Sequence, residues 1–128
     1  MQAIKISWNG ELELNADLSD TATARAIADA LPIETRVNTW GDEHYFGIPV
    51  QADAEPGASA AVELGDLAYW PPGNAFCVFF GPTPASHGPD DIRAASPVNV
   101  VGRLRSTPVA ELQAIRSGAM VRIEALDE

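Results

Sequence analysis

The chain has 128 residues, of which 46% are hydrophobic, and a formal net charge of −10. This length predicts one domain over residues 1–128 that can bury a core without disulfide bonds. The acidic balance argues against nucleic acid or an anionic membrane as a partner, because both require a basic face. No run approaches the roughly 20 apolar residues of a membrane span, and the N-terminus has no signal-peptide pattern. We expect a cytoplasmic protein, since its single cysteine, Cys77, cannot form an internal disulfide.

The first part of the chain predicts a hairpin followed by a helix. Residues 2–14 read as two strands joined by an Asn-Gly pair, which is a strong signal for a hairpin turn. Ser19 or Asp20 can cap a helix that runs to about Leu31, where a proline stops it. A second hairpin is then predicted from residues 36–50, with its turn at a Gly-Asp pair, and a polar loop follows it.

Residues 65–81, with the sequence GDLAYWPPGNAFCVFFG, predict a third hairpin. Its second strand, residues 75–80, is apolar at every position, and alternate side chains of a strand point to opposite faces. Phe76, Val78 and Phe80 therefore share one face, and Cys77 and Phe79 share the other. One face can belong to the core, and the other must be covered by more protein or by a ligand.

The last part of the chain begins with its longest irregular stretch, residues 81–97, which is rich in Pro, Gly, Ser and Asp. A strand is predicted over residues 98–104, a short helix capped by Thr107 follows it, and residues 120–126 form the last strand. The total is about eight strands and two helices without strand–helix alternation. This pattern is typical of a closed antiparallel barrel whose ends are covered by helices.

Three segments carry a resemblance to a known family: VNTWGDEHYFGIPV, GDLAYWPPGNAFCVFFG, and ASPVNVVGRL followed by ELQAIRSG. Together they resemble the cyclophilin barrel and look closest to the small prokaryotic cyclophilin-like domain family, whose biochemical role is largely unassigned. The resemblance implies a mainly β fold, namely a closed antiparallel cyclophilin-like β-barrel of about eight strands with two short helices at its ends.

True cyclophilins isomerise X-Pro bonds with an arginine that hydrogen-bonds the strained peptide beside an apolar pocket for the proline ring. By this resemblance Phe80 falls on the pocket phenylalanine, while Val78 and Val98 fall where the family has a glutamine and a histidine. The arginine belongs in the segment of residues 37–50, which contains none. Because the barrier is about 18–20 kcal/mol and its lowering depends on a positioned donor, we expect weak isomerase activity or none.

The candidate ligand-binding side chains are aromatic or polar groups that the barrel would present at one cleft: Asn38, Trp40, Glu43, Tyr45, Trp70, Phe80 and Asn99. Trp40, Tyr45 and Trp70 can equally pack in the core or at its rim. Asn99 interrupts an apolar strand, so its side chain either ties down a loop or projects into the cleft. In the cyclophilin arrangement Cys77 and Phe79 would fill the barrel, and Val78 and Phe80 would line the cleft.

Other chemistry finds little support in the sequence. His44, His87 and Cys77 have no partners at ligand spacing, so we expect no metal and no cofactor. Cys77 lies in an apolar run, which favours an inert core thiol. Ser86 and His87 are adjacent in the long irregular stretch, and adjacent residues there cannot readily form the geometry of a catalytic triad.

Two functions follow. The first is a binding domain for a small, partly apolar molecule or a proline-containing peptide. The alternative is a peptidyl-prolyl cis-trans isomerase with weak or altered activity. A small-molecule enzyme with Glu43 as its base is a third reading that rests only on the position of that residue. The oligomeric state stays open, because an exposed aromatic face can also be a dimer contact.

Overall fold

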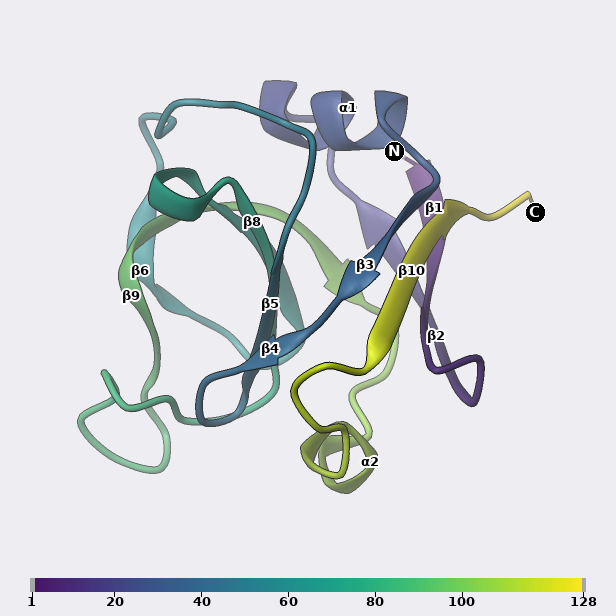
Figure 1. The fold of residues 1–128 in the computed structure, drawn as a ribbon. Coiled ribbons are helices and arrows are strands. Elements are labelled where there is room, and N and C mark those ends of the chain that lie inside the picture. Colours follow the sequence, from purple (N-terminus) through teal and green to yellow (C-terminus); the bar gives the residue numbers. More distant parts are fainter. Residues whose placement is uncertain (1, 128) are drawn as a thin grey trace.

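The computed structural model describes residues 2–127 and consists mainly of antiparallel strands (Figure 1). The strands are β1 (Gln2–Trp8), β2 (Leu12–Leu18), β3 (Ile33–Arg36), β4 (Asn38–Thr39), β5 (Glu43–Gly47), β6 (Ser59–Val62), β7 (Asp66–Trp70), β8 (Ala75–Phe79), β9 (Ile92–Leu104) and β10 (Met120–Ala125). The helices are α1 (Ala22–Asp29) and α2 (Val109–Gln113), and a 3₁₀ turn, η1 (Pro71–Gly73), joins β7 to β8. The two α-helices lie at opposite ends of the sheet (Figure 1).

The strands pair in the order β3-β10-β1-β2-β9-β7-β8-β5-β4, and β6 pairs with β9 beside this path. Each of these pairs is antiparallel, which confirms the mainly β fold with two helices. The described residues form ten strands, two more than the sequence indicated. The path has two ends, β3 and β4, which are successive segments separated by Val37. The closed barrel therefore stays a prediction.

The main core lies on one face of this sheet. It contains Trp8 of β1, Phe46 of β5, Phe76 and Val78 of β8, and Phe80, which directly follows β8. Both helices contribute to it, since α1 buries an isoleucine and α2 a leucine. These side chains are removed from water almost completely, and burial of this kind contributes about 1.5–3 kcal/mol for each large side chain.

The helix caps differ from those predicted. Thr21, and not Ser19 or Asp20, caps α1, because its side-chain oxygen accepts a hydrogen bond from the amide of Ala24 at 3.1 Å. The N-cap of α2 is Pro108 and makes no side-chain hydrogen bond, so Thr107 does not cap that helix. Ser, Thr and Asp are all favoured at an N-cap, so residue type alone does not decide which of several neighbouring candidates begins the helix.

A second, smaller apolar cluster lies on the opposite face of the sheet and contains Ala68, Cys77, Phe79, Ala94 and Val98. β8 is therefore buried on both faces, as its uninterrupted apolar sequence indicated. The predicted use of these faces is wrong. Val78 and Phe80 belong to the main core, whereas Cys77 and Phe79 lie in the smaller cluster beneath β9.

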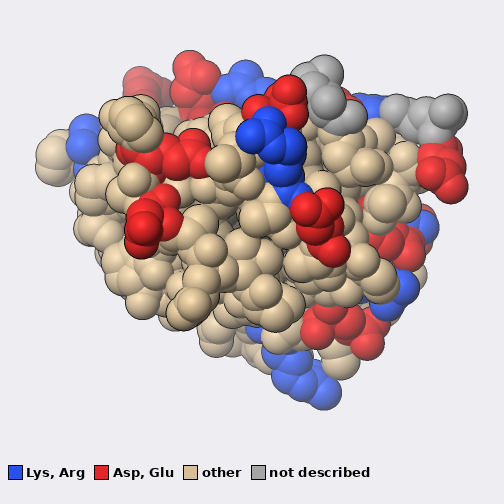
Figure 2. Space-filling view, turned by 90° about the horizontal axis from the view of Figure 1, so that it is seen from above, with Lys and Arg blue, Asp and Glu red and all other residues tan. Residues whose placement is uncertain are grey.

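Charged residues lie mainly at the surface. Figure 2, which views the molecule from the side of α1, shows acidic and basic side chains interspersed among uncharged ones. A buried exception is Asp66, whose carboxylate accepts a hydrogen bond from the Arg103 guanidinium at 2.9 Å. Among the helices of residues 2–127, none has the length and apolar character that a membrane crossing requires.

Candidate functional site

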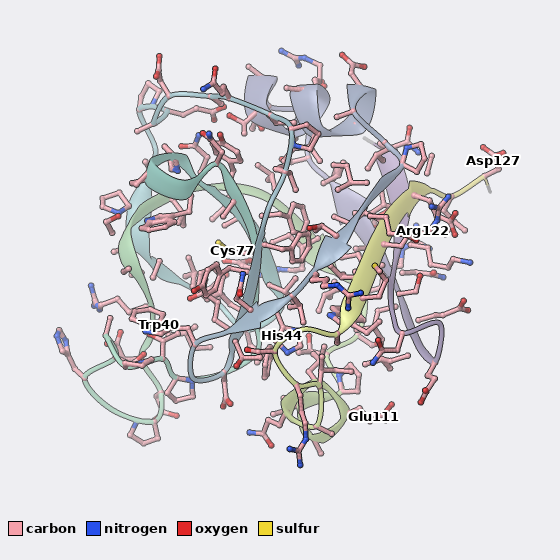
Figure 3. The ribbon with its side chains drawn as sticks, viewed as in Figure 1. Trp40, His44, Cys77, Glu111, Arg122 and Asp127 are labelled. Carbon is pink, nitrogen blue, oxygen red and sulfur yellow. The ribbon has the colours of Figure 1, made fainter. Side chains whose placement is uncertain are left out.

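A cavity of about 260 Å³ lies between β9 and the face of β5, β7 and β8 that points away from the main core. Eight residues line it: Trp40, Glu43, Tyr45, Trp70, Cys77, Ala94, Ala95 and Val98. In Figure 3 the labelled Trp40 and Cys77 lie on the side toward β9, and His44 lies on the side toward β10 and α2. The cavity therefore occupies the face that carries the smaller apolar cluster.

Strand register brings the side chains of this cavity together. Tyr45 of β5 and Cys77 of β8 are direct partners, and paired residues of an antiparallel ladder point to the same face. Glu43 lies two residues before Tyr45, so its side chain points to that face as well. On β7, Ala68 also pairs with Cys77, so Trp70, two residues after Ala68, points to the same face. His44, between Glu43 and Tyr45, faces the core instead.

A bulge in β9 forms the opposite wall. Ser59 of β6 pairs with Val98, but Ala61 pairs with Arg93, so residues 94–97 have no continuous partners on β6. Bulges redirect the chain and are common beside functional sites. Ala94 and Ala95 of this bulge line the cavity, and the Ser96 hydroxyl accepts a hydrogen bond from the Trp70 indole at 2.7 Å.

The prediction that residues 81–97 are irregular throughout is wrong, because β9 begins at Ile92 and not at Val98. The local sequence Ala-Ala-Ser-Pro nevertheless contains a signal for the bulge. A proline has no amide to donate within a sheet, so inside a strand it is confined to edges, strand starts and bulges.

A tight turn between β4 and β5 fixes the position of Trp40 and Glu43. The Trp40 amide donates to the Glu43 carbonyl at 2.9 Å, which closes the turn. Gly41 has a φ of 60°, and a Cβ atom there would lie 2.9 Å from both Thr83 Cα and Pro84 Cδ. The amide of Asp42 donates to the Pro82 carbonyl at 3.0 Å. Glycine thus allows the turn to lie against the segment of residues 82–84.

Glu43 supplies the carboxyl group of the cavity, and only 6% of its surface is exposed. Burial disfavours the charged carboxylate and raises the pKa of Glu43 to about 7, although the neighbouring Cys77 thiol opposes part of this rise. Burial, together with the charge of Glu43, raises the pKa of the Cys77 thiol well above its usual range. Cys77 is therefore a protonated thiol at neutral pH, and Glu43 is the group that changes its charge there.

The structure brings four of the seven candidate residues together at the cavity: Trp40, Glu43, Tyr45 and Trp70. Asn38 is exposed on β4, and its amide donates to the Tyr45 carbonyl at 3.4 Å. Phe80 is 2% exposed and packs in the main core, with its ring centroid 4.8 Å from that of His44. Neither of these two residues lines the cavity.

Asn99, the remaining candidate, ties down a loop, which was one of the two roles predicted for it. Its side-chain oxygen accepts from the Glu55 amide at 2.8 Å. Its side-chain nitrogen donates to the Asp53 carbonyl at 3.0 Å and to the Thr23 hydroxyl at 3.2 Å. These bonds connect β9 to α1 and to the loop that precedes β6, on the core side of the sheet.

Four lining residues were not among the candidates: Cys77, Ala94, Ala95 and Val98. The alternation along β8 separates Cys77 from Phe80 but does not say which of them faces the core, because both faces are apolar. Ala94 and Ala95 carry no chemical signal of their own, and Val98 was singled out only by the resemblance, as the position of the family's histidine. Within residues 2–127, no three His, Cys, Asp or Glu side chains lie close enough together to hold a metal ion.

A family model described as cyclophilin-like matches residues 2–124, so the chain belongs to this family. Among solved structures, the chain is similar to a protein of Archaeoglobus fulgidus that is described as hypothetical and was determined in solution. The two sequences are 42% identical, and the match has a TM-score of 0.80 and covers 98% of this chain and 95% of the other. No curated protein matches the chain.

Proposed function

We propose that this member of the cyclophilin-like family binds a small, partly apolar molecule in the cavity between β5, β7, β8 and β9. The observation that carries the proposal is an aromatic and aliphatic cavity that contains one buried carboxyl group, Glu43. Small-molecule sites have this composition, with apolar walls that supply affinity and a few polar groups that fix the orientation of the ligand.

The volume of the cavity limits the size of the ligand. About 260 Å³ is slightly less than the roughly 300–1,000 Å³ that is usual for sites of drug-sized molecules. A second hollow, of about 690 Å³, lies between the β1–β2 turn and α2. Its charged residues, Glu11, Glu111 and Arg116, are all exposed, so among residues 2–127 it presents no buried charged group to a ligand, and its buried polar atom is the Trp8 indole nitrogen. We therefore place the ligand at Glu43.

The alternative of a prolyl isomerase receives less support from the geometry. The residue that would carry it, Phe80, is buried in the main core and does not line the cavity. The described residues that line the cavity include no arginine, and a positioned donor to the peptide is what the isomerisation requires. These observations favour ligand binding over isomerisation.

Narrowing the cavity tests the proposal. Ala95 is exposed at its rim, so Ala95→Phe adds bulk there without repacking the core. Fragments that bind the wild-type protein, found by thermal shift and confirmed by calorimetry, should bind this variant at least about tenfold more weakly, the equivalent of about 1.4 kcal/mol. Ala110→Phe, at an exposed position of α2, is the matched control and should bind them unchanged. Fragments that bind Ala95→Phe as tightly as wild type would place their site elsewhere and overturn the proposal.

A further inference from the structure

We infer that the ligand of this cavity carries a positively charged nitrogen, in the form of a small organic ammonium group held between the aromatic walls and the Glu43 carboxylate. This inference rests on the proposed function and specifies the chemical class of the ligand. Three observations on residues 2–127 carry it: the absence of an ion-pair partner for Glu43, the aromatic composition of the walls, and the absence of cationic side chains from the cavity lining.

The first observation is a contrast between two buried acidic residues. Glu43 and Asp66 are each 6% exposed. The Asp66 carboxylate has a cation beside it, the Arg103 guanidinium at 2.9 Å. Within residues 2–127, no lysine, arginine or histidine forms an ion pair with Glu43. Buried carboxylates normally have such a partner, because an unpaired charge in an apolar environment is strongly destabilising. At pH values where Glu43 is ionised, a ligand is the remaining source of a cation for it.

The second observation is the set of aromatic side chains around the carboxyl group. Trp40, Tyr45 and Trp70 line the same cavity as Glu43. The faces of aromatic rings attract cations, and cages of this kind recognise methylated ammonium groups in particular. The aliphatic remainder of the lining, including Ala94 and Val98, suits methyl and methylene groups.

The third observation argues against an anionic ligand. Within the described residues, no lysine, arginine or histidine lines the cavity. The indole N–H of Trp70, which could donate to an anion, already donates to the Ser96 hydroxyl at 2.7 Å. The net charge of −10 further disfavours the approach of anions and favours that of cations.

A neutral ligand that accepts a hydrogen bond from protonated Glu43 is the competing possibility, and pH separates the two. A permanently charged ammonium ion binds the carboxylate, so its affinity rises as Glu43 loses its proton. A hydrogen-bond acceptor binds the carboxylic acid, so its affinity falls over the same range. The titratable groups that share the cavity with Glu43 are Tyr45 on β5 and Cys77 on β8. Burial holds the pKa of Cys77 well above its usual range, so the thiol stays neutral here.

The experiment compares choline with its uncharged isostere, 3,3-dimethylbutan-1-ol, which has the same shape and lacks only the charge. Calorimetry at pH 8 should show choline binding the wild-type protein at least about tenfold more tightly than the isostere, as expected for desolvated cation–π and ionic contacts. Glu43→Gln should remove this preference, and Glu111→Gln, which removes the same charge from an exposed site on α2, should keep it. Choline affinity should also rise from pH 6 to pH 8 in the wild type.

Two results would overturn the inference. If the isostere binds the wild type as tightly as choline does and Glu43→Gln changes neither affinity, the cavity accepts neutral ligands and only the proposed function stands. If neither probe binds at millimolar concentration, the inferred ammonium class of ligand is wrong. The comparison of fragment binding to wild type and to Ala95→Phe then tests separately whether the cavity binds any ligand.

Discussion

At the scale of single residues, Glu43 and His44 show how one strand serves two different environments. They are neighbours on β5, and their side chains point to opposite faces. The His44 Nε2–H donates to the Leu112 carbonyl at 3.1 Å, and its ring packs against Trp8 and Phe80. Burial lowers the pKa of His44 to about 4, just as it raises the pKa of Glu43 to about 7. Both residues are therefore held toward their neutral forms.

The two shifts affect stability in opposite directions as pH changes. Between about pH 4.5 and 7, the folded protein retains a proton on Glu43 that the unfolded chain has lost, so this residue lowers the stability as pH rises. Between about pH 4 and 6.5, the unfolded chain carries a proton on His44 that the folded protein lacks, so this residue lowers the stability as pH falls. Their contributions offset each other between about pH 4.5 and 6.5.

Replacing Glu43 with glutamine separates these contributions. Relative to wild type, Glu43→Gln should gain about 2–3 kcal/mol of unfolding free energy between pH 4.5 and pH 7.5, because each unit of pKa shift corresponds to about 1.4 kcal/mol. Urea unfolding of both proteins across this range measures the difference, in which the contributions of all other groups cancel. A difference that does not vary with pH would mean that Glu43 titrates near its ordinary pKa.

At the scale of elements, the turn between β4 and β5 depends on contact between distant segments. Gly41 needs its positive φ for the turn and its lack of a side chain for contact with residues 82–84. The turn at Gly10 between β1 and β2 also has a positive φ, of 68°, but no atom lies within 4 Å of a Cβ placed there. An alanine at Gly10 would therefore introduce backbone strain alone, whereas an alanine at Gly41 would introduce both backbone strain and a steric clash.

Alanine at these two positions should have unequal effects. Gly10→Ala should destabilise the protein by about 1–2 kcal/mol through backbone strain alone. Gly41→Ala should cost roughly a further 1–3 kcal/mol, because the added methyl group meets backbone atoms, and it should weaken ligand binding by displacing Trp40 and Glu43. Chemical denaturation measures both stabilities. Equal losses in the two variants would contradict the role of the contact with residues 82–84.

The same scale shows what the sequence could and could not predict. The Asn9-Gly10 turn was predicted from its residue types, and both residues adopt the positive φ that such a turn requires. The orientation of β8 was not predictable, because its two faces are equally apolar and only the position of β9 decides between them. The cavity wall from β9 was missed because Pro97 is compatible with either a loop or a bulge, and only pairing with β6 decides for the bulge.

At the scale of the whole molecule, the sheet separates a core from a site. The core occupies the face on which α1 and α2 bury side chains, and the cavity occupies the opposite face beneath β9. The strand pattern and the family resemblance predicted the mainly β fold, and the aromatic and polar residue types brought Trp40, Glu43, Tyr45 and Trp70 into consideration. The family resemblance also located the predicted cleft. It placed the cleft beside Phe80, on the face that this chain uses as its core. A cavity on the other face supports a function different from prolyl isomerisation.

The three tryptophans of the chain allow the most direct test of this arrangement. Trp40 and Trp70 line the cavity, whereas Trp8 is fully buried in the main core. Their three indole N–H signals can be followed by NMR while a bound fragment or choline is added. Binding in the cavity should shift the signals of Trp40 and Trp70 until they saturate and should leave the signal of Trp8 in place. A ligand that shifts Trp8 and leaves Trp40 and Trp70 unchanged would contradict this arrangement.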